Sequence, residues 1–582
     1  MNLTEFLTRV DESVKQMSRE ELENFLHLRA RTLSEKKRDE FIEQLLYVQD
    51  KLRDSTDEYS IDSIKAELSA IMEELQKIET GEIGIGSRYN EEYDDWYCDI
   101  SEEFIFEDTK EIGNIIDRAC ALLHTALKSG LFSDARALSE KMMSLIVEIY
   151  GDYENYSGEP MSLVRLYHDD ILSFDFTGWG LDTLYSVYIT EDIRNRPKSL
   201  YKLFMYFNNA NLSIERLMQS RYNDLPEIDE FLTEWIQYLG TKKEAYAQTL
   251  IKEASGLLNN GGNRLAIAQK YGAEHPGLYE QLLTDRTGFS TAELLKIGEE
   301  ALESIPENLV IRSRIALLTA EYALELNKPQ IAEECWIEAY RSDTNPINFL
   351  RIAVNSKAYE SRITELRSIY DRFSDKRVYK YSFARNDELY ENIIDDNTYY
   401  TLMFFGGEFR RMVESGMNAD YGLGWSSTFM KCGIALLLIY LFNGNELPSG
   451  CEAMCSLAMD YIGFDKGKYL QGIADEAKDT EGKELFLDCF EKWKKDTPME
   501  MTDREYILKK LDSWVSIRVE GIMKENRRRY YNECAAYIAA LGEVNESLGI
   551  TNGKALLMEL YRKKYSRRSA FRAELRRFGM ID

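Results

Sequence analysis

The chain has 582 residues, of which 44% are hydrophobic, so it can bury a large core and wholesale disorder is excluded. Only 9 prolines, with abundant Leu, Ala, Glu and Lys, favour helices over a turn-rich β architecture. The formal net charge of −29 should repel nucleic-acid backbone from most of the surface, so a nucleic-acid role requires a local basic patch.

Residues 1–79 are predicted to form a small N-terminal helical unit. Apolar residues recur there at helical spacing, and Ser18 with Glu21 forms a capping box at the start of a second helix. The stretch 61–78 has the pattern of an amphipathic helix whose charged side chains face solvent.

A Gly-rich and acidic stretch, 80–110, follows and is predicted to be a linker. Within it, 91–108 carries nine acids and no base. Gly84 and Gly86 lack the downstream Gly, Lys and Ser/Thr that complete a phosphate-binding loop. We therefore expect a surface segment here and no phosphate site.

The most informative stretch is 313–346, where small residues stand at positions at which two helices must touch. Ala320 lies in the first predicted helix, and Ala332 and Ala339 lie in the second with the large Trp336 between them. Small against large at these spacings lets antiparallel helices approach closely and then stack on a neighbour. The helices are predicted at 313–326 and 329–342, with Trp336 buried.

Similar hairpins recur at 120–150 and 432–461. These units resemble tetratricopeptide repeats, most clearly at 313–346, although the Trp-Leu-Gly signature of the first helix is absent. The resemblance implies an all-α chain in which 111–520 forms an α-solenoid of stacked helical hairpins, a fold whose usual role is binding other proteins.

Other helices are predicted between the hairpins, at 198–207, 227–239 and 241–258. Ser290 and Glu293 form a capping box that should start a helix. Thr502 and Glu505 form a second one. The best strand candidate is 378–383.

The longest apolar run is 432–442, which at 11 residues is too short to span a bilayer and predicts a buried helix. No signal peptide is visible at the N-terminus, so we expect a cytoplasmic protein without a membrane partner. We expect no cofactor and no bound metal. The scattered cysteines should be reduced thiols; they are Cys98, Cys120, Cys335, Cys432, Cys451, Cys455, Cys489 and Cys534.

The C-terminal segment, 521–582, differs from the rest because it holds 13 Lys or Arg against 7 Asp or Glu. It is similar, over 565–575, to the helical tails of some bacterial proteins that carry a SWIM-type zinc finger. The Cys-x-Cys and Cys-x-His ligands of that finger are absent, so no zinc function is implied. The bases could bind nucleic-acid phosphates or, as the overall charge favours, an acidic protein surface on this chain or a partner. The candidate partner-binding residues are Arg527, Arg528, Arg529, Arg562, Lys563, Lys564, Arg567, Arg568, Arg572, Arg576 and Arg577.

One catalytic alternative rests on His168, Asp169 and Asp170, the best metal-like cluster in the sequence. It resembles the His-Asp dyad of HD-type phosphohydrolases, which are helical and also need a separate His and a distant Asp. His124 and Asp175 would have to fill these roles, but Asp175 lies too close in sequence to be the distant ligand. A solvated helix end is the favoured interpretation.

A second catalytic alternative rests on Arg118 and His124, which fit the Arg-x5-His pattern of HEPN ribonucleases. In that helical family, the two residues would act on the ribose 2′-hydroxyl and the phosphate. Here Ala119 replaces the polar residue that often follows the Arg. Six residues correspond to about 600° of helical rotation, so the two side chains should not share one face of a straight helix.

Cys451 and Cys455 lie one helical turn apart, but no His neighbours them, so a buried pair of small residues is favoured over a metal site. The sequence therefore favours a non-catalytic, bacterial-looking scaffold or adaptor. The alternatives are a helical phosphohydrolase or ribonuclease using His124 or His168, and a nucleic-acid-binding regulatory subunit using the basic tail.

Overall fold

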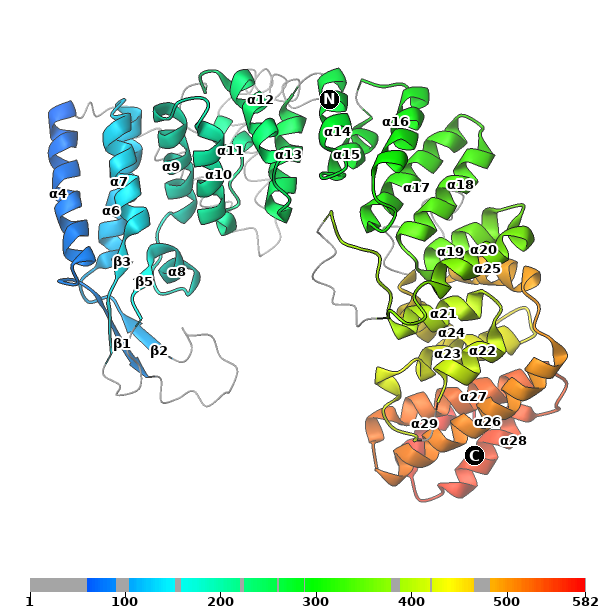
Figure 1. The fold of residues 1–582 in the computed structure, drawn as a ribbon. Helices are drawn as coiled ribbons and strands as arrows, with labels where there is room; N and C mark the ends of the chain where they lie inside the picture. Colours follow the sequence, from blue (N-terminus) through cyan, green and yellow to red (C-terminus); the bar gives the residue numbers. More distant parts are fainter. Residues whose placement is uncertain are drawn as a thin grey trace, which may run out of the picture. The chain divides into compact units, whose positions relative to one another are not determined.

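Helices far outnumber strands in the described residues, so the predicted all-α fold class is confirmed (Figure 1). The computed structural model describes residues 60–89, 104–151, 159–219, 225–258, 261–286, 288–377, 388–418, 421–464 and 482–580. The chain divides into two compact units, one comprising 1–191 with 200–212 and the other 192–199 with 213–582. This division falls inside the range 111–520, which the sequence predicts as one continuous body.

The first unit combines helices with two small sheets. Its elements are α4 (Ile61–Glu79), β1 (Ile85–Tyr89), β2 (Phe104–Glu107), α6 (Ile112–Lys128), α7 (Phe132–Ser144), β3 (Ile146–Val147), β4 (Ile149–Gly151), β5 (Met161–Ser162), α8 (Leu163–His168) and α9 (Phe176–Thr190). Helix α10 (Arg196–Tyr206) straddles the boundary between the units. The helix predicted at 61–78 and the hairpin predicted at 120–150 are confirmed as α4 and as α6 with α7.

The stretch predicted as a linker contributes two strands instead. β1 pairs antiparallel with β2 and parallel with β4, so that Gly86 lies opposite both Glu107 and Tyr150. β3 pairs antiparallel with β5 in a second sheet. A Cβ on Gly84 would overlap the Glu148 carbonyl and the Tyr150 ring, so glycine is what lets the chain approach β4 here. Gly84 therefore serves strand packing, whereas a Cβ on Gly86 would make only ordinary contacts.

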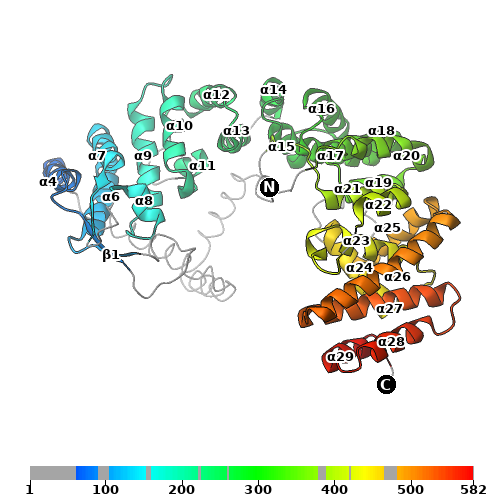
Figure 2. The same ribbon diagram turned by 60° about the horizontal axis from the view of Figure 1, so that its bottom comes forward.

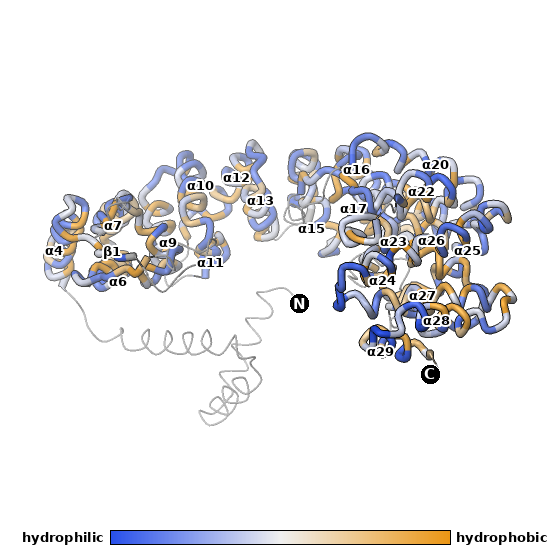
Figure 3. Tube along the Cα trace, turned by 90° about the horizontal axis from the view of Figure 1, so that it is seen from below, coloured by the Kyte–Doolittle hydropathy of each residue, from blue (hydrophilic) through white to orange (hydrophobic). Residues whose placement is uncertain are grey.

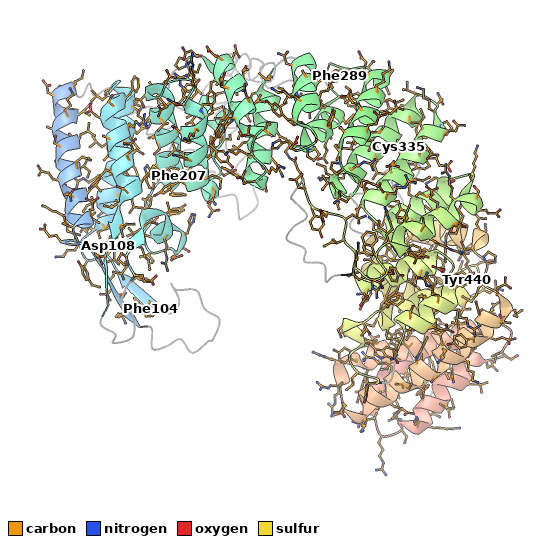
Figure 4. All side chains as sticks on the ribbon, in the orientation of Figure 1. Phe104, Asp108, Phe207, Phe289, Cys335 and Tyr440 are labelled. Atoms are coloured by element: carbon orange, nitrogen blue, oxygen red, sulfur yellow. The ribbon has the colours of Figure 1, made fainter. Side chains whose placement is uncertain are left out.

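Side chains at the start of α6 and in the aromatic core fix the first unit. Asp108 accepts hydrogen bonds from the backbone nitrogens of Ile112 and Gly113, each at 2.8 Å, and so satisfies two N–H groups at the start of the helix (Figure 4). Further along the chain, the rings of Trp179 and Phe207 pack edge to face with centroids 4.9 Å apart. Both residues are buried.

The second unit is a succession of helices. They are α11 (Ile214–Met218), α12 (Ile228–Leu239), α13 (Ala245–Leu257), α14 (Gly261–Tyr271), α15 (Gly277–Asp285), α16 (Thr291–Ser304), α17 (Val310–Glu325), α18 (Pro329–Ser342), α19 (Pro346–Asn355), α20 (Tyr359–Asp371), α21 (Asp396–Phe405), α22 (Phe409–Gly416), α23 (Met430–Leu441), α24 (Ser449–Ile462), α25 (Gly482–Asp496), α26 (Met501–Lys524), α27 (Tyr531–Ser547), α28 (Gly553–Lys564) and α29 (Ser569–Arg577). The short 3₁₀ turns η4 (Trp425–Ser427) and η6 (Arg528–Tyr530) lie before α23 and α27.

Helices α17 and α18 form the hairpin predicted at 313–346 (Figure 1). Ala320, Ala332 and Trp336 are all buried, as their spacing predicts. Helix α16 also packs closely against α17, because a Cβ on Gly298 of α16 would overlap the Thr319 side chain of α17. Small residues therefore set the distances between α16, α17 and α18.

One predicted helix start is confirmed and one is wrong. Ser290 and Glu293 form the expected capping box at α16. At α26 the helix begins at Met501 after an extended Glu500, so Thr502 lies inside the helix and caps nothing. The predicted Ser18 capping box and the strand candidate 378–383 lie outside the described residues.

The hairpin predicted at 432–461 is also confirmed, as α23 and α24. Every residue of α23 from Cys432 to Leu441 is buried, in agreement with the prediction of a buried helix. Among the described helices, none combines the length and apolar character needed to cross a lipid bilayer.

Substituting Ala332 by Trp should destabilise the second unit by about 1–3 kcal/mol, because the larger side chain would overpack the closely packed core in which Ala332 is fully buried. Gln330→Trp on the exposed side of the same helix is the matched control. Urea unfolding of the two variants measures the difference. Equal midpoints would show that Ala332 is not at a close contact.

A buried histidine precedes α15. His275 is fully buried, and burial lowers its pKa from the ordinary value of 6.5, while the charges on Glu388 and Glu274 act in the opposite direction. Glu388 is itself buried, accepts a hydrogen bond from the Gly277 nitrogen at 2.9 Å and pairs with Lys252 at 2.5 Å. His275 is therefore held neutral beside a carboxylate that caps α15.

This arrangement predicts a loss of stability on acidification. Because the folded pKa of His275 lies below the unfolded value, the unfolded chain takes up a proton first as the pH falls through about 6.5. The free energy of unfolding therefore has its full contribution from neutral His275 above that pH, and this contribution decreases as the pH falls below it. His275→Gln should flatten the dependence of the urea midpoint between about pH 7 and pH 5, whereas His168→Gln, at an exposed position, should not. If the urea midpoint depended on pH in the same way in the unmodified chain, His275→Gln and His168→Gln, the proposed role of His275 would be contradicted.

Candidate functional site

Helix α27 is the centre of the C-terminal helices and lies between α26 and the pair α28–α29 (Figure 2). Two of its contacts need glycine. A Cβ on Gly450 of α24 would overlap the backbone nitrogen of Ala540, and a Cβ on Gly542 would overlap the backbone of Lys554 in α28. The small residues of α27 therefore bring α24 and α28 to backbone contact.

A buried carboxylate of α27 joins the same three helices. Glu543 accepts hydrogen bonds from the backbone nitrogens of Gly450 at 3.0 Å and Cys451 at 2.8 Å, at the start of α24. Lys554 of α28 pairs with it at 2.6 Å. Helix N-termini attract negative charge, so this geometry satisfies both the carboxylate and the helix end.

A second carboxylate of α27, Glu533, holds two cations. Arg518 of α26 pairs with it at 2.7 Å and also donates to the Gly422 carbonyl at 2.7 Å, and its side chain is only 2% exposed. Lys431 pairs with the other carboxylate oxygen at 2.6 Å. The Tyr530 ring lies 5.1 Å from the Arg518 guanidinium and 5.6 Å from the Lys431 nitrogen.

The two basic runs of the C-terminal segment meet beside this network. Arg568, between α28 and α29, donates to the Asn526 side chain at 2.6 Å and to the Met523 carbonyl at 3.1 Å. Lys564 pairs with Glu520 of α26. Phe571 packs edge to face on Tyr531, with centroids 5.6 Å apart. The turn after α28 is thereby fixed against the end of α26 and the start of α27.

We define the basic surface as the cationic residues at this junction: Lys524, Arg527, Arg528, Arg529, Lys564, Arg567, Arg568 and Arg572. Arg527, Arg528 and Arg567 are exposed and make no ion pair with another described residue. The segments 520–530 and 562–572 hold ten bases and only two acids, so their positive field is not cancelled locally.

Three of the four remaining candidates from the tail pair with an acid three or four residues away on their own helix. Arg562 pairs with Glu559 at 2.6 Å and Lys563 pairs with the same carboxylate at 3.3 Å. Arg577 pairs with Glu574 at 2.9 Å. Arg576 is exposed near the end of α29, which is hydrophilic over most of its length (Figure 3). These four residues lie outside the basic surface as defined.

The ribonuclease-like pair is not brought together. Arg118 makes two hydrogen bonds to Glu74 of α4, at 2.9 and 3.1 Å, and is exposed. His124 faces α9, where its Nδ1 lies 3.2 Å from Asp182. The two side chains thus engage different helices, as the rotation between them predicts. Cys120, one turn before His124, is buried, and burial raises the pKa of its thiol with help from Asp175 and other acids, so it is no ready nucleophile.

The phosphohydrolase-like cluster is also dispersed. His168 is exposed at the end of α8, and Asp169 pairs with Arg165 at 3.3 Å. Asp175 caps α9 by accepting from the Gly178 nitrogen at 2.8 Å. Within the described ranges, no group of three or more His, Cys, Asp or Glu side chains is arranged to hold a metal.

Cys451 and Cys455 are buried free thiols, as are the other described cysteines. Burial raises the pKa of both thiols, to about 11 for Cys455. Metal ligation requires thiolates, so these residues act as small packing side chains.

Replacing Arg518 by Met should destabilise the C-terminal helices by about 1–3 kcal/mol, because it removes one of the two cations of the partly buried Glu533 and the donor to the Gly422 carbonyl. Arg410→Met, at an exposed ion pair, is the matched control and should change little. Denaturant unfolding followed by tryptophan fluorescence gives both values. If Arg518→Met changed the free energy of unfolding as little as Arg410→Met does, the ion pairs of Glu533 would not be needed for folding.

The basic surface brings exposed cations from the end of α26, the turn before α27 and the turn after α28 together on packed helices. The buried Glu543 and the partly buried Glu533 support this surface, and the sequence gives no signal for either beyond its position in an alanine-rich helix. Neither models of known protein families nor curated protein sequences give a match to this chain.

Proposed function

We propose that this chain is a non-catalytic helical scaffold or adaptor that binds a protein partner through the basic surface. The observation that supports the proposal is the meeting of Arg527 and Arg528 with Arg567 at one junction, held by Arg568 and Asn526. A rigid surface binds with less loss of conformational entropy than a flexible tail. The tetratricopeptide-like spacing agrees with this role, and we propose a cytoplasmic location.

Electrostatics explains why this junction, and not the rest of the chain, should attract a partner. The chain carries −29 overall, while the segment 521–582 carries an excess of bases. An acidic partner would be repelled elsewhere and drawn to this end, with an effect that weakens as salt increases.

Nucleic acid is the second candidate, because Tyr530 and Tyr565 lie among the bases and could stack on nucleotide bases. The two candidates differ in salt dependence. Binding to phosphates should weaken by about one log unit of affinity per log unit of salt for each phosphate contact. Binding to an acidic protein that also buries apolar surface should depend on salt less steeply.

Neutralising the basic surface should abolish partner binding. In the full chain, Arg527→Gln, Arg528→Gln and Arg567→Gln together remove three exposed charges. The matched control changes the exposed lysines Lys492, Lys495 and Lys509 to Gln, which alters the net charge equally. Quantitative affinity purification from the native cell should lose specific proteins only with the arginine variant.

The same experiment addresses the enzyme alternative. His124→Ala with His168→Ala should leave both partner recovery and biological activity intact. Loss of activity in this double variant, with an unchanged fold, would overturn the scaffold proposal. Recovery of nucleic acid instead of protein, lost in the arginine variant, would favour the second candidate.

A further inference from the structure

The outer face of α28 exposes a short apolar stripe. Leu556 is 62% exposed and Leu560 is 56% exposed, and at a spacing of four residues they lie on one face of the helix. The opposite face is buried through Met558 and Tyr561. The leucines are therefore presented on a helix whose position is already fixed by packing, so they are not a frayed end.

The stripe continues directly into cations. Lys563 and Lys564 follow Leu560 by three and four residues, and Arg567 lies in the turn beyond them. The Lys563 side chain is 74% exposed even though it pairs with Glu559. One face of α28 thus changes, within about two turns, from apolar to cationic. A surface of this kind matches a ligand that is apolar at one end and acidic at the other.

We propose that α28 docks an amphipathic helix of a partner protein, with leucine-type residues over Leu556 and Leu560 and acidic residues over Lys563 and Arg567. This inference rests on the proposed function and names the chemistry of its partner. Helix-in-groove and helix-on-helix recognition use apolar anchors at intervals of three and four residues, which is the spacing that α28 offers.

Two other classes of partner fit less well. Nucleic acid would use the cations but would leave both leucines exposed to water. An anionic membrane would meet only two leucines, with no exposed aromatic side chain on α28 to insert beside them. The carboxylate of Glu559 lies between the leucines along the chain and would face lipid as well. A protein helix is the occupant that uses both halves of the face.

The probe is a fluorescein-labelled synthetic helical peptide of roughly 20 residues, long enough to lie along α28 and the following turn. It carries Leu at intervals of three and four residues, with Glu in its last two turns. Binding to the full chain is followed by fluorescence anisotropy. A second peptide has every Leu replaced by Ser, and a third has every Glu replaced by Gln. Both altered peptides should bind more weakly than the first by about tenfold or more.

The matching change in the protein is Leu556→Gln with Leu560→Gln, which keeps the helix and removes the stripe. It should weaken binding of the first peptide by at least about tenfold. Leu324→Gln, at an exposed leucine of α17, is the control and should bind as the unmodified chain does. Circular dichroism should be unchanged in all three proteins, since these leucines are exposed.

Several results would overturn the inference. One is equal affinity for the Leu and Ser peptides. Another is an unchanged affinity in the Leu556 and Leu560 variant. A third is leucine-dependent binding to phosphatidylserine vesicles without peptide binding, which would assign the face to membranes. If the leucine variant still recovers native partners that the arginine variant loses, the inference fails while the proposed function stands.

Discussion

The close approach of α27 to its neighbours is the constraint on which the C-terminal helices depend. Gly450 and Gly542 allow backbone contact with α27 on two sides, and Ala539 and Ala540 leave room for it. Such contacts leave no space for water, so any polar group inside them must be paired. Glu543 meets this requirement by taking its partners from the start of α24 and from α28.

The same helix also explains how an acidic chain can present a basic surface. Glu543 is buried and the Glu533 side chain is 14% exposed, and these two acids of α27 neutralise three cations beneath the surface, Arg518, Lys431 and Lys554. The arginines on the outside are then left with little local acid to cancel them. Because the surface is supported by packed helices and not by a free tail, its charges keep fixed positions for a partner.

Part of the fold and of the basic surface could be predicted from the sequence. Local spacing is sufficient for the α17–α18 hairpin, because helix faces repeat every three to four residues, and counting charges is sufficient to single out the basic residues. Their meeting could not be predicted, because Asn526 and Arg568, which form a hydrogen bond, are 42 residues apart in the sequence. The strands in 80–110 were missed for a similar reason, since Gly86 pairs with Tyr150 far along the chain.

The central claim is that the two basic runs form one rigid surface. Double electron–electron resonance tests it most directly, with spin labels at Arg528→Cys and Arg567→Cys in the full chain. Cys98→Ser would also be introduced, so that the native cysteines left in the chain are the seven that are buried. The account predicts a single narrow distance distribution that is the same in low and high salt, because hydrogen bonds from Arg568 to uncharged acceptors and aromatic packing hold the junction. A broad distribution, or one that shifts with salt, would contradict it.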